Sequence, residues 1–208
     1  MLHFSAVSPE ALELLREIQH LPILNDFYLV CGTALALHYG HRISVDLDFF
    51  TEKEFDTSIL IDTFKEKYKL EILSQTKNTL TLNIRFVKTD FIRHNYPLLN
   101  SVQKIEGVKL LSIEDIAAMK LNSTMNRGSK KDFYDIYELF NHFDLEELIS
   151  FHASKYDFSS QFILLKSLIY FDDAEQEPDP VSVKDISWDA VKNKIVETVR
   201  GFSKKQMA

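Results

Sequence analysis

The sequence has only one cysteine, one tryptophan, five glycines and five prolines among its 208 residues. With Cys31 alone, no disulfide can form within the chain, which is the cysteine usage of a reducing cytoplasm. No stretch is long and apolar enough to cross a membrane, and the first residues lack a signal-peptide pattern. Basic residues are outnumbered 24 to 31 by acidic ones, and the net charge of −7 argues against broad, sequence-independent nucleic-acid binding. We therefore expect a cytoplasmic protein without a membrane partner, whose nucleic-acid contacts, if any, lie in a local basic patch.

The length and composition suit one domain, or one domain with a helical appendage. Hydrophobic residues make up 45% of the chain and aromatic residues 12%, which is enough to build an ordinary core. The patterns predict an α/β (or α+β) fold with a small mixed sheet of about four or five strands and helices on one face. A helical C-terminal part follows. The predicted division is a core at residues 1–111 and a helical region at residues 112–208.

A turn between a strand and a helix is the first candidate binding element. A short apolar run, Phe27 to Cys31, ends at Gly32-Thr33 and is followed by helix-forming residues as far as Gly40. The free N–H groups and the positive dipole end of a helix N-terminus favour phosphate. The sequence predicts that Gly32 and Thr33 bind phosphate. The simpler alternative is a plain helix start with the threonine side chain turned inward.

Two aspartates follow this helix on one predicted strand. Val45, Leu47 and Phe49 point to one face of it. Asp46 and Asp48 point to the other, where two carboxylates repel each other unless a cation lies between them. The pattern therefore predicts a site for divalent metal. The alternative is a solvated edge strand with two exposed acids.

Together these residues resemble a known family. The Gly-Thr turn, the helix, His41-Arg42-x-Ser44-x and the run Asp46-Leu47-Asp48-Phe49-Phe50 are similar to the AbiEii/AbiGii-type nucleotidyltransferase toxins of the DNA polymerase β-like superfamily. The resemblance covers roughly residues 27 to 140. The family usually has two glycines before the threonine, and here the first is Cys31. If that position requires a positive φ, the cysteine backbone is strained.

The resemblance implies roles for individual residues. Asp46 and Asp48 would hold two Mg²⁺ ions together with the triphosphate of the NTP substrate. Asp90, on a strand predicted from Val87 to Ile92, would complete the metal site and take a proton from the attacking hydroxyl; the alternative is a surface aspartate. The residues implied to bind the nucleotide are Gly32, Thr33, Arg42 and Ser44. Arg42 has a loop charge as its alternative.

Two predicted helices carry a second pair. A helix from Ser112 to about Asn126 places Lys120 in the middle of its apolar face, where an ammonium needs a partner. Asp132 lies at the edge of the apolar face of the next helix, so the two are candidate partners. The family carries a Lys and a Lys-Asp-x-x-Asp pattern on paired helices, which implies catalytic roles for Lys120 and Asp132. Alternatively, Asp132 satisfies the helix start at Ser129.

The function that follows is nucleotidyl transfer: a hydroxyl attacks the α-phosphorus of an NTP and pyrophosphate leaves. The resemblance implies the toxin of a bacterial toxin–antitoxin or phage-defence system, with a cognate antitoxin as partner and an RNA 3′ end, most plausibly of tRNA, as acceptor. The residues expected to contact RNA are Arg85, Arg127, Lys130 and Lys131. One alternative is a small-molecule nucleotidyltransferase of the antibiotic-modifying type, with an acceptor pocket in the helical half. Another is a non-catalytic nucleotide-binding protein with the same fold.

Overall fold

The computed structural model describes residues 1–156 and 160–206, which form two compact units. The first unit comprises Met1–Gly40, Ser44–Tyr96 and Ser101–Leu111. The second comprises His41–Ile43, Pro97–Asn100 and the described residues from Ser112 onward. The division into domains at residues 1–111 and 112–208 stays a prediction. Within the described ranges, no helix combines the length and apolar character that crossing a lipid bilayer requires.

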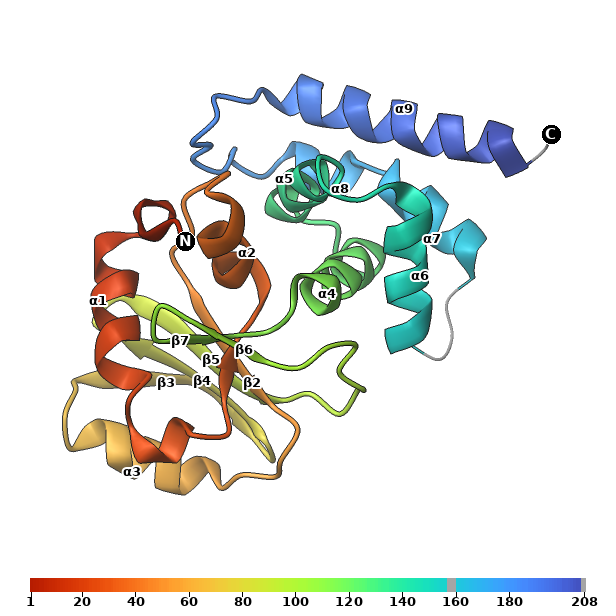
Figure 1. The fold of residues 1–208 in the computed structure, drawn as a ribbon. Helices are drawn as coiled ribbons and strands as arrows, with labels where there is room; N and C mark the ends of the chain where they lie inside the picture. Colours follow the sequence, from red (N-terminus) through yellow and green to blue (C-terminus); the bar gives the residue numbers. More distant parts are fainter. Residues whose placement is uncertain (157–159, 207–208) are drawn as a thin grey trace. The chain divides into compact units, whose positions relative to one another are not determined.

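The first unit is built on a mixed seven-stranded sheet with the order β3-β4-β5-β2-β1-β7-β6 (Figure 1). The strands are β1 (Tyr28–Leu29), β2 (Leu47–Thr51), β3 (Leu70–Thr76), β4 (Thr79–Ile84), β5 (Val87–Arg93), β6 (Gln103–Ile105) and β7 (Val108–Leu110). β2 pairs with β5, and β1 with β7, in parallel; the other neighbours are antiparallel. The α/β fold class is confirmed, but the expected four or five strands are too few.

The central hairpin follows from strict alternation in the sequence. Leu80, Leu82 and Ile84 of β4 are fully buried, while the residues between them are not. The chain turns at Arg85 and Phe86, both at positive φ, without the glycine or asparagine that such turns favour. β5 then returns beside β4, with Ile84 opposite Val87. This hairpin delivers Asp90 to the strand next to β2.

Helices of the first unit contact this sheet. The helices of this unit are the short η1 (Phe4–Ala6) and η2 (Pro22–Leu24), and α1 (Pro9–Ile18), α2 (Cys31–Tyr39) and α3 (Thr57–Lys65). The start of α1 is fixed by Ser8, whose hydroxyl accepts the N–H of Ala11, with Pro9 at the first position. α1 contacts β5, α2 contacts β2, and α3 contacts β3. Gly40 ends α2 in the left-handed conformation, at φ 62°.

The second unit is helical. Its helices are α4 (Ile113–Asn126), α5 (Lys130–Leu139), α6 (Leu145–Lys155), α7 (Gln161–Leu168), α8 (Asp172–Glu175) and α9 (Trp188–Gln206). α9 contacts α5, α6 and α7. The indole of Trp188 lies 5.8 Å from the ring of Phe133 and 6.0 Å from that of Tyr134, measured between centroids. The segment 41–43 joins this unit by pairing with residues 181–183, with Ile43 N–H donating to the carbonyl of Val181.

An ion pair that the sequence does not signal lies inside this unit. Lys155 Nζ is 2.7 Å from Asp115 Oδ1, and both side chains have no exposed surface. The backbone N–H of Leu99 also donates to Asp115 at 3.0 Å, and Lys155 donates to the carbonyl of Pro97 at 2.8 Å. These bonds attach the segment 97–100 to the helices of its own unit. A buried pair needs such extra bonds to offset its desolvation.

Candidate functional site

The Gly-Thr turn begins α2, as predicted. Cys31 is the first residue of the helix and has φ 59°, in the left-handed region, so the expected strain at this position is confirmed. Gly32 and Thr33 follow in the first turn. The N–H groups of a first helical turn have no partner four residues back within the helix. This turn is therefore where the chain can offer backbone donors to phosphate.

Thr33 and Ser44 hold the segment that leads into the acidic strand. The Thr33 hydroxyl, fully buried, donates to the backbone carbonyl of Asp46. Its oxygen lies 2.7 Å from Ser44 Oγ. Because Thr33 has only one hydroxyl proton and a carbonyl can only accept, Ser44 donates to Thr33. Both hydroxyls, expected to contact phosphate, are thus used within the protein to position Asp46.

The predicted acids lie on neighbouring strands. Asp48 of β2 is the direct register partner of Asp90 of β5, so both side chains leave the same face of the sheet. Asp46 directly precedes β2, which begins at Leu47 rather than at the expected Val45. Asp90 is 8% exposed, and its buried Oδ1 has no hydrogen-bond partner among the described residues. An orphaned carboxylate oxygen of this kind is a ready ligand for a cation.

Lys88 also lies on this face of the sheet, and the sequence analysis did not predict a role for it. Its Nζ donates to Asp90 Oδ2. The signal was available, because residues two apart on a strand share a face. In the described part of the chain, no three His, Cys, Asp or Glu side chains are arranged to hold a metal ion. The acids that the sequence assigns to metal binding therefore share their face with an ammonium group.

In the second unit, Lys120 and Asp132 form the predicted pair. Lys120 Nζ is 3.0 Å from Asp132 Oδ1 and 2.6 Å from Asp135 Oδ2, and the lysine side chain is 3% exposed. Asp132 also accepts from the Ser129 hydroxyl at 2.7 Å and from Arg127 Nε at 2.9 Å. The pairing of Asp132 with Lys120 is thus confirmed. Asp132 also binds the hydroxyl of the N-cap residue Ser129, but the Ser129 side chain makes no capping hydrogen bond to α5. No catalytic role follows from these bonds.

Arg42 belongs to the same buried cluster. Its Nε and Nη2 donate to Asp135 at 2.7 and 2.9 Å, and its side chain is 5% exposed. His41 Nε2 lies 2.6 Å from Asp135 Oδ1. The arginine was expected to contact phosphate, but its guanidinium is bound to a carboxylate, because a buried cation needs an anion beside it. Asp135 was part of the Lys-Asp-x-x-Asp pattern, yet the sequence reading gave it no role.

These ion pairs keep both carboxylates ionised. Burial alone would raise the pKa of Asp135, but the charges of Arg42 and Lys120 and the hydrogen bonds of His41 and Arg42 hold it well below its usual range. Burial also opposes ionisation of Asp132, yet Lys120 and Arg127 lower its pKa. The cluster is therefore charged throughout the neutral range.

Two residues expected to contact RNA do not lie where the prediction assumed. Lys130 is not an exposed cation: its side chain is 6% exposed, and its Nζ binds Asp179 at 3.0 Å. Arg85 lies in the β4–β5 turn instead of on the strand, and it binds Glu17 at 2.9 Å. Arg127, whose side chain is 56% exposed, remains at the surface.

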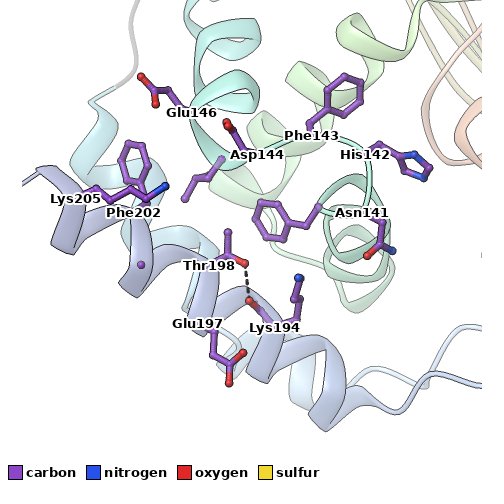
Figure 2. A pocket seen from close by; sticks show the side chains of 13 residues that line it. Asn141, His142, Phe143, Asp144, Glu146, Lys194, Glu197, Thr198, Phe202 and Lys205 are labelled. Carbon is purple, nitrogen blue, oxygen red and sulfur yellow. Dashed lines mark hydrogen bonds between the residues drawn. The ribbon is translucent and has the colours of Figure 1, made fainter.

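Among the described residues, the second unit contains at least two pockets. One, of about 430 Å³, separates the loop between α5 and α6 from the C-terminal half of α9; Figure 2 shows Phe143 and Asp144 on one side and Lys194 and Thr198 on the other. The other, of about 480 Å³, lies between the end of α4 and the end of α7. Arg127, Lys166 and Tyr170 are among the residues that line it. Only the second pocket includes an expected RNA contact.

Comparison with known proteins gives one family and one curated relative. The family model described as "Nucleotidyl transferase AbiEii toxin, Type IV TA system" matches residues 13–106 and 58–204. An uncharacterized protein of Aquifex aeolicus (strain VF5) is 42% identical over 177 residues, which cover 81% of this chain and 84% of the relative.

Solved structures share the fold. A Helicobacter pylori protein described as a candidate nucleotidyltransferase aligns over 95% of this chain and 96% of its own, with a TM-score of 0.63 and 21% identity. MenT4, a nucleotidyltransferase toxin of Mycobacterium tuberculosis, aligns over 91% of this chain and 82% of its own, with a TM-score of 0.55 and 14% identity. At these identities, the likeness establishes the fold.

Proposed function

Because the chain belongs to the AbiEii family of nucleotidyl transferase toxins, we propose that it transfers a nucleotide from an NTP to the 3′ end of an RNA. Its family and its activity class, nucleotidyltransferase, are those expected from the sequence. The finer statements are proposals: tRNA is the acceptor, Mg²⁺ is the metal, with two ions bound, and the reaction takes place in the cytoplasm.

The register of Asp48 and Asp90 is the observation that carries this proposal. Two carboxylates on adjacent strands, with Asp46 held nearby through Thr33, offer the oxygen ligands that Mg²⁺ prefers. The orphaned Oδ1 of Asp90 fits such a ligand. A bound divalent metal would neutralise charge on the triphosphate and on the departing pyrophosphate. The donor chemistry therefore fits the metal, although Lys88 must leave Asp90 first.

The remaining residues orient the reactants. We assign phosphate binding to the backbone N–H groups of Gly32 and Thr33, at the N-terminus of α2. The acceptor hydroxyl loses its proton to Asp90 as its oxygen bonds to the α-phosphorus and the bond to pyrophosphate breaks. We assign Lys120 and Asp132 a structural role, because their buried pair stabilises the helices that carry them.

The metal-site assignment is tested by variants that each remove the charge of one aspartate. Asp48→Asn should fold normally and lose about 100-fold or more of its Mg²⁺-dependent nucleotide transfer. Asp62→Asn, an exposed change on α3 of the same unit, is the matched control and should keep full activity. Full transfer by the Asp48 variant would show that the reaction takes place elsewhere.

The acceptor is tested at the pocket between α4 and α7. Arg127 and Lys166 supply cations and Tyr170, 52% exposed, supplies a ring on which a base can stack. Incubation with each labelled NTP and total RNA should label tRNA 3′ ends. Lys166→Glu should weaken this labelling without changing NTP affinity, whereas Lys194→Glu, in the other pocket, should have no effect. RNA unlabelled with all four nucleotides would refute the RNA acceptor.

A small-molecule acceptor is the second candidate, favoured by the pocket beside α9. Its volume of about 430 Å³ falls within the range of small-ligand sites, and it lies in the helical unit, where an acceptor pocket was expected. Thr198→Trp should fill this pocket. Loss of transfer to a small molecule, with RNA unlabelled in the wild type, would favour this reaction.

The toxin role is tested in cells. Expression of the wild type should arrest growth, and Asp48→Asn should not. A cognate antitoxin should restore growth when co-expressed, and a phage-defence role predicts fewer plaques on cells that carry both proteins. Unimpaired growth with soluble, active enzyme would refute toxicity.

A further inference from the structure

Lys88 stands at the proposed metal site with its charge directed at one ligand. It precedes Asp90 by two residues on β5, so both side chains leave the same face of the sheet. Its Nζ donates to Asp90 Oδ2, while the buried Oδ1 of that carboxylate has no partner among the described residues. Asp90 Oδ2 thus binds an ammonium group, whereas the buried Asp90 Oδ1 is not used in a hydrogen bond among the described residues.

The ammonium also lies in the field of the other two acids. Partial burial alone would lower the pKa of Lys88, yet that pKa is raised, because Lys88 donates to Asp90 and because Asp90, Asp48 and Asp46 carry negative charge nearby. The lysine therefore offsets part of a repulsion that would otherwise act between adjacent strands.

We propose that Lys88 is the internal counter-ion of the acidic face: it occupies Asp90 in the metal-free protein and is displaced when a divalent metal binds. This inference rests on the proposed metal site. Lys88 is a positioning residue that makes metal binding a cation exchange.

The proposal predicts the direction in which metal affinity and melting temperature change when Lys88 is replaced. Removing the ammonium frees Asp90 Oδ2 for the metal and removes a positive charge that repels it, so metal affinity should rise. It also removes the cation bound to Asp90 Oδ2, so the metal-free protein should melt at a lower temperature. Because the Lys88 side chain is 48% exposed, the pair is screened by water, and the expected rise in affinity is about fivefold.

The experiment is a titration of the whole protein with Mn²⁺ as the probe, followed by calorimetry, beside thermal melts without metal. Lys88→Met should bind Mn²⁺ about fivefold more tightly than the wild type. Lys88→Arg, which keeps the charge, should bind no more tightly than the wild type. Lys53→Met removes an exposed partner of Asp26 in the same unit and should change nothing. If Lys88→Met does not fold, Lys88→Gln provides the same test.

Failure of this inference differs from failure of the metal site. Equal or weaker Mn²⁺ binding by Lys88→Met or Lys88→Gln, with the wild type binding normally, overturns the counter-ion role alone. Mn²⁺ binding that is unchanged by Asp46→Asn and Asp48→Asn overturns the metal site, and the counter-ion role with it.

Discussion

Asp135→Asn should strongly destabilise the protein, although it changes only one group. The Asp135 side chain has no exposed surface, and its carboxylate meets Arg42 Nε at 2.7 Å and Lys120 Nζ at 2.6 Å. An amide of the same shape keeps one oxygen acceptor, but it loses the negative charge and places an NH₂ group among donors. The variant therefore retains the side-chain volume, removes the compensation of buried charge and replaces one acceptor by a donor.

The magnitude follows from which buried cations lose the charge of Asp135. Lys120 keeps Asp132 at 3.0 Å, so most of the cost falls on Arg42, whose side chain is 5% exposed. Removing one partner of a buried pair costs about 3–5 kcal/mol. For a chain of this length, such a loss lowers the melting temperature by roughly 10 °C.

The assay is urea and thermal unfolding followed by circular dichroism at pH 7. Asp189→Asn is the matched control, because it makes the same chemical change in the same unit at an aspartate whose side chain is 83% exposed. The control should stay within about 0.5 kcal/mol of the wild type. A loss below about 1 kcal/mol in Asp135→Asn would show that water or another anion reaches Arg42, and it would refute the account of this cluster.

Three further predictions concern the fold and the site. Cys31→Gly should raise the free energy of unfolding by up to about 1 kcal/mol, because φ 59° suits glycine, whereas Cys31→Val should lower it. Thermal melts of both variants check this, and the opposite order would contradict the account of strain at Cys31. Thr33→Val removes the bond to the Asp46 carbonyl, so the transfer rate should fall while the protein melts within about 1 kcal/mol of the wild type, as single-turnover kinetics and melts would show. The pKa of Asp135 is depressed, so its contribution is complete above the unfolded pKa of about 3.9 and is lost as the pH falls below it. Hence the stability gap between wild type and Asp135→Asn, measured by urea unfolding, should shrink as the pH falls below about 4.

Parts of the fold with clear periodicity could be predicted from the sequence. The alternation of Leu80, Leu82 and Ile84 in the sequence is typical of a strand, and β4 lies there; Ser8 followed by Pro9 is typical of a helix start, and α1 begins there. The strands β6 and β7, with three residues each, are too short to carry a period, so the sheet is larger than expected. Their place in the sheet depends on pairing with distant residues, as between Leu110 and Leu29.

Some residues of the candidate site were likewise predictable from the sequence, and others were not. Asp46 and Asp48 were predictable because a two-residue spacing fixes their shared direction, and the turn before them narrows the chemistry. Lys88 obeys the same rule with respect to Asp90, but lysines in strands are usually solvated, so the spacing alone did not mark it. Its significance depends on the bond to Asp90, which only the structure supplies.

The role of Asp135 could not be predicted from local sequence patterns. Asp132 and Asp135 are three residues apart on one helix, and both face Lys120. What distinguishes Asp135 is its bond to Arg42, 93 residues earlier in the sequence, and no helical period contains that separation. Arg42 stands only two residues before Ser44, which with Thr33 holds Asp46 in place. The six residues 41–46 therefore supply both a buried ion cluster and the approach to the acidic strand, so a substitution in this motif that abolishes activity must be tested for folding before it is assigned to chemistry.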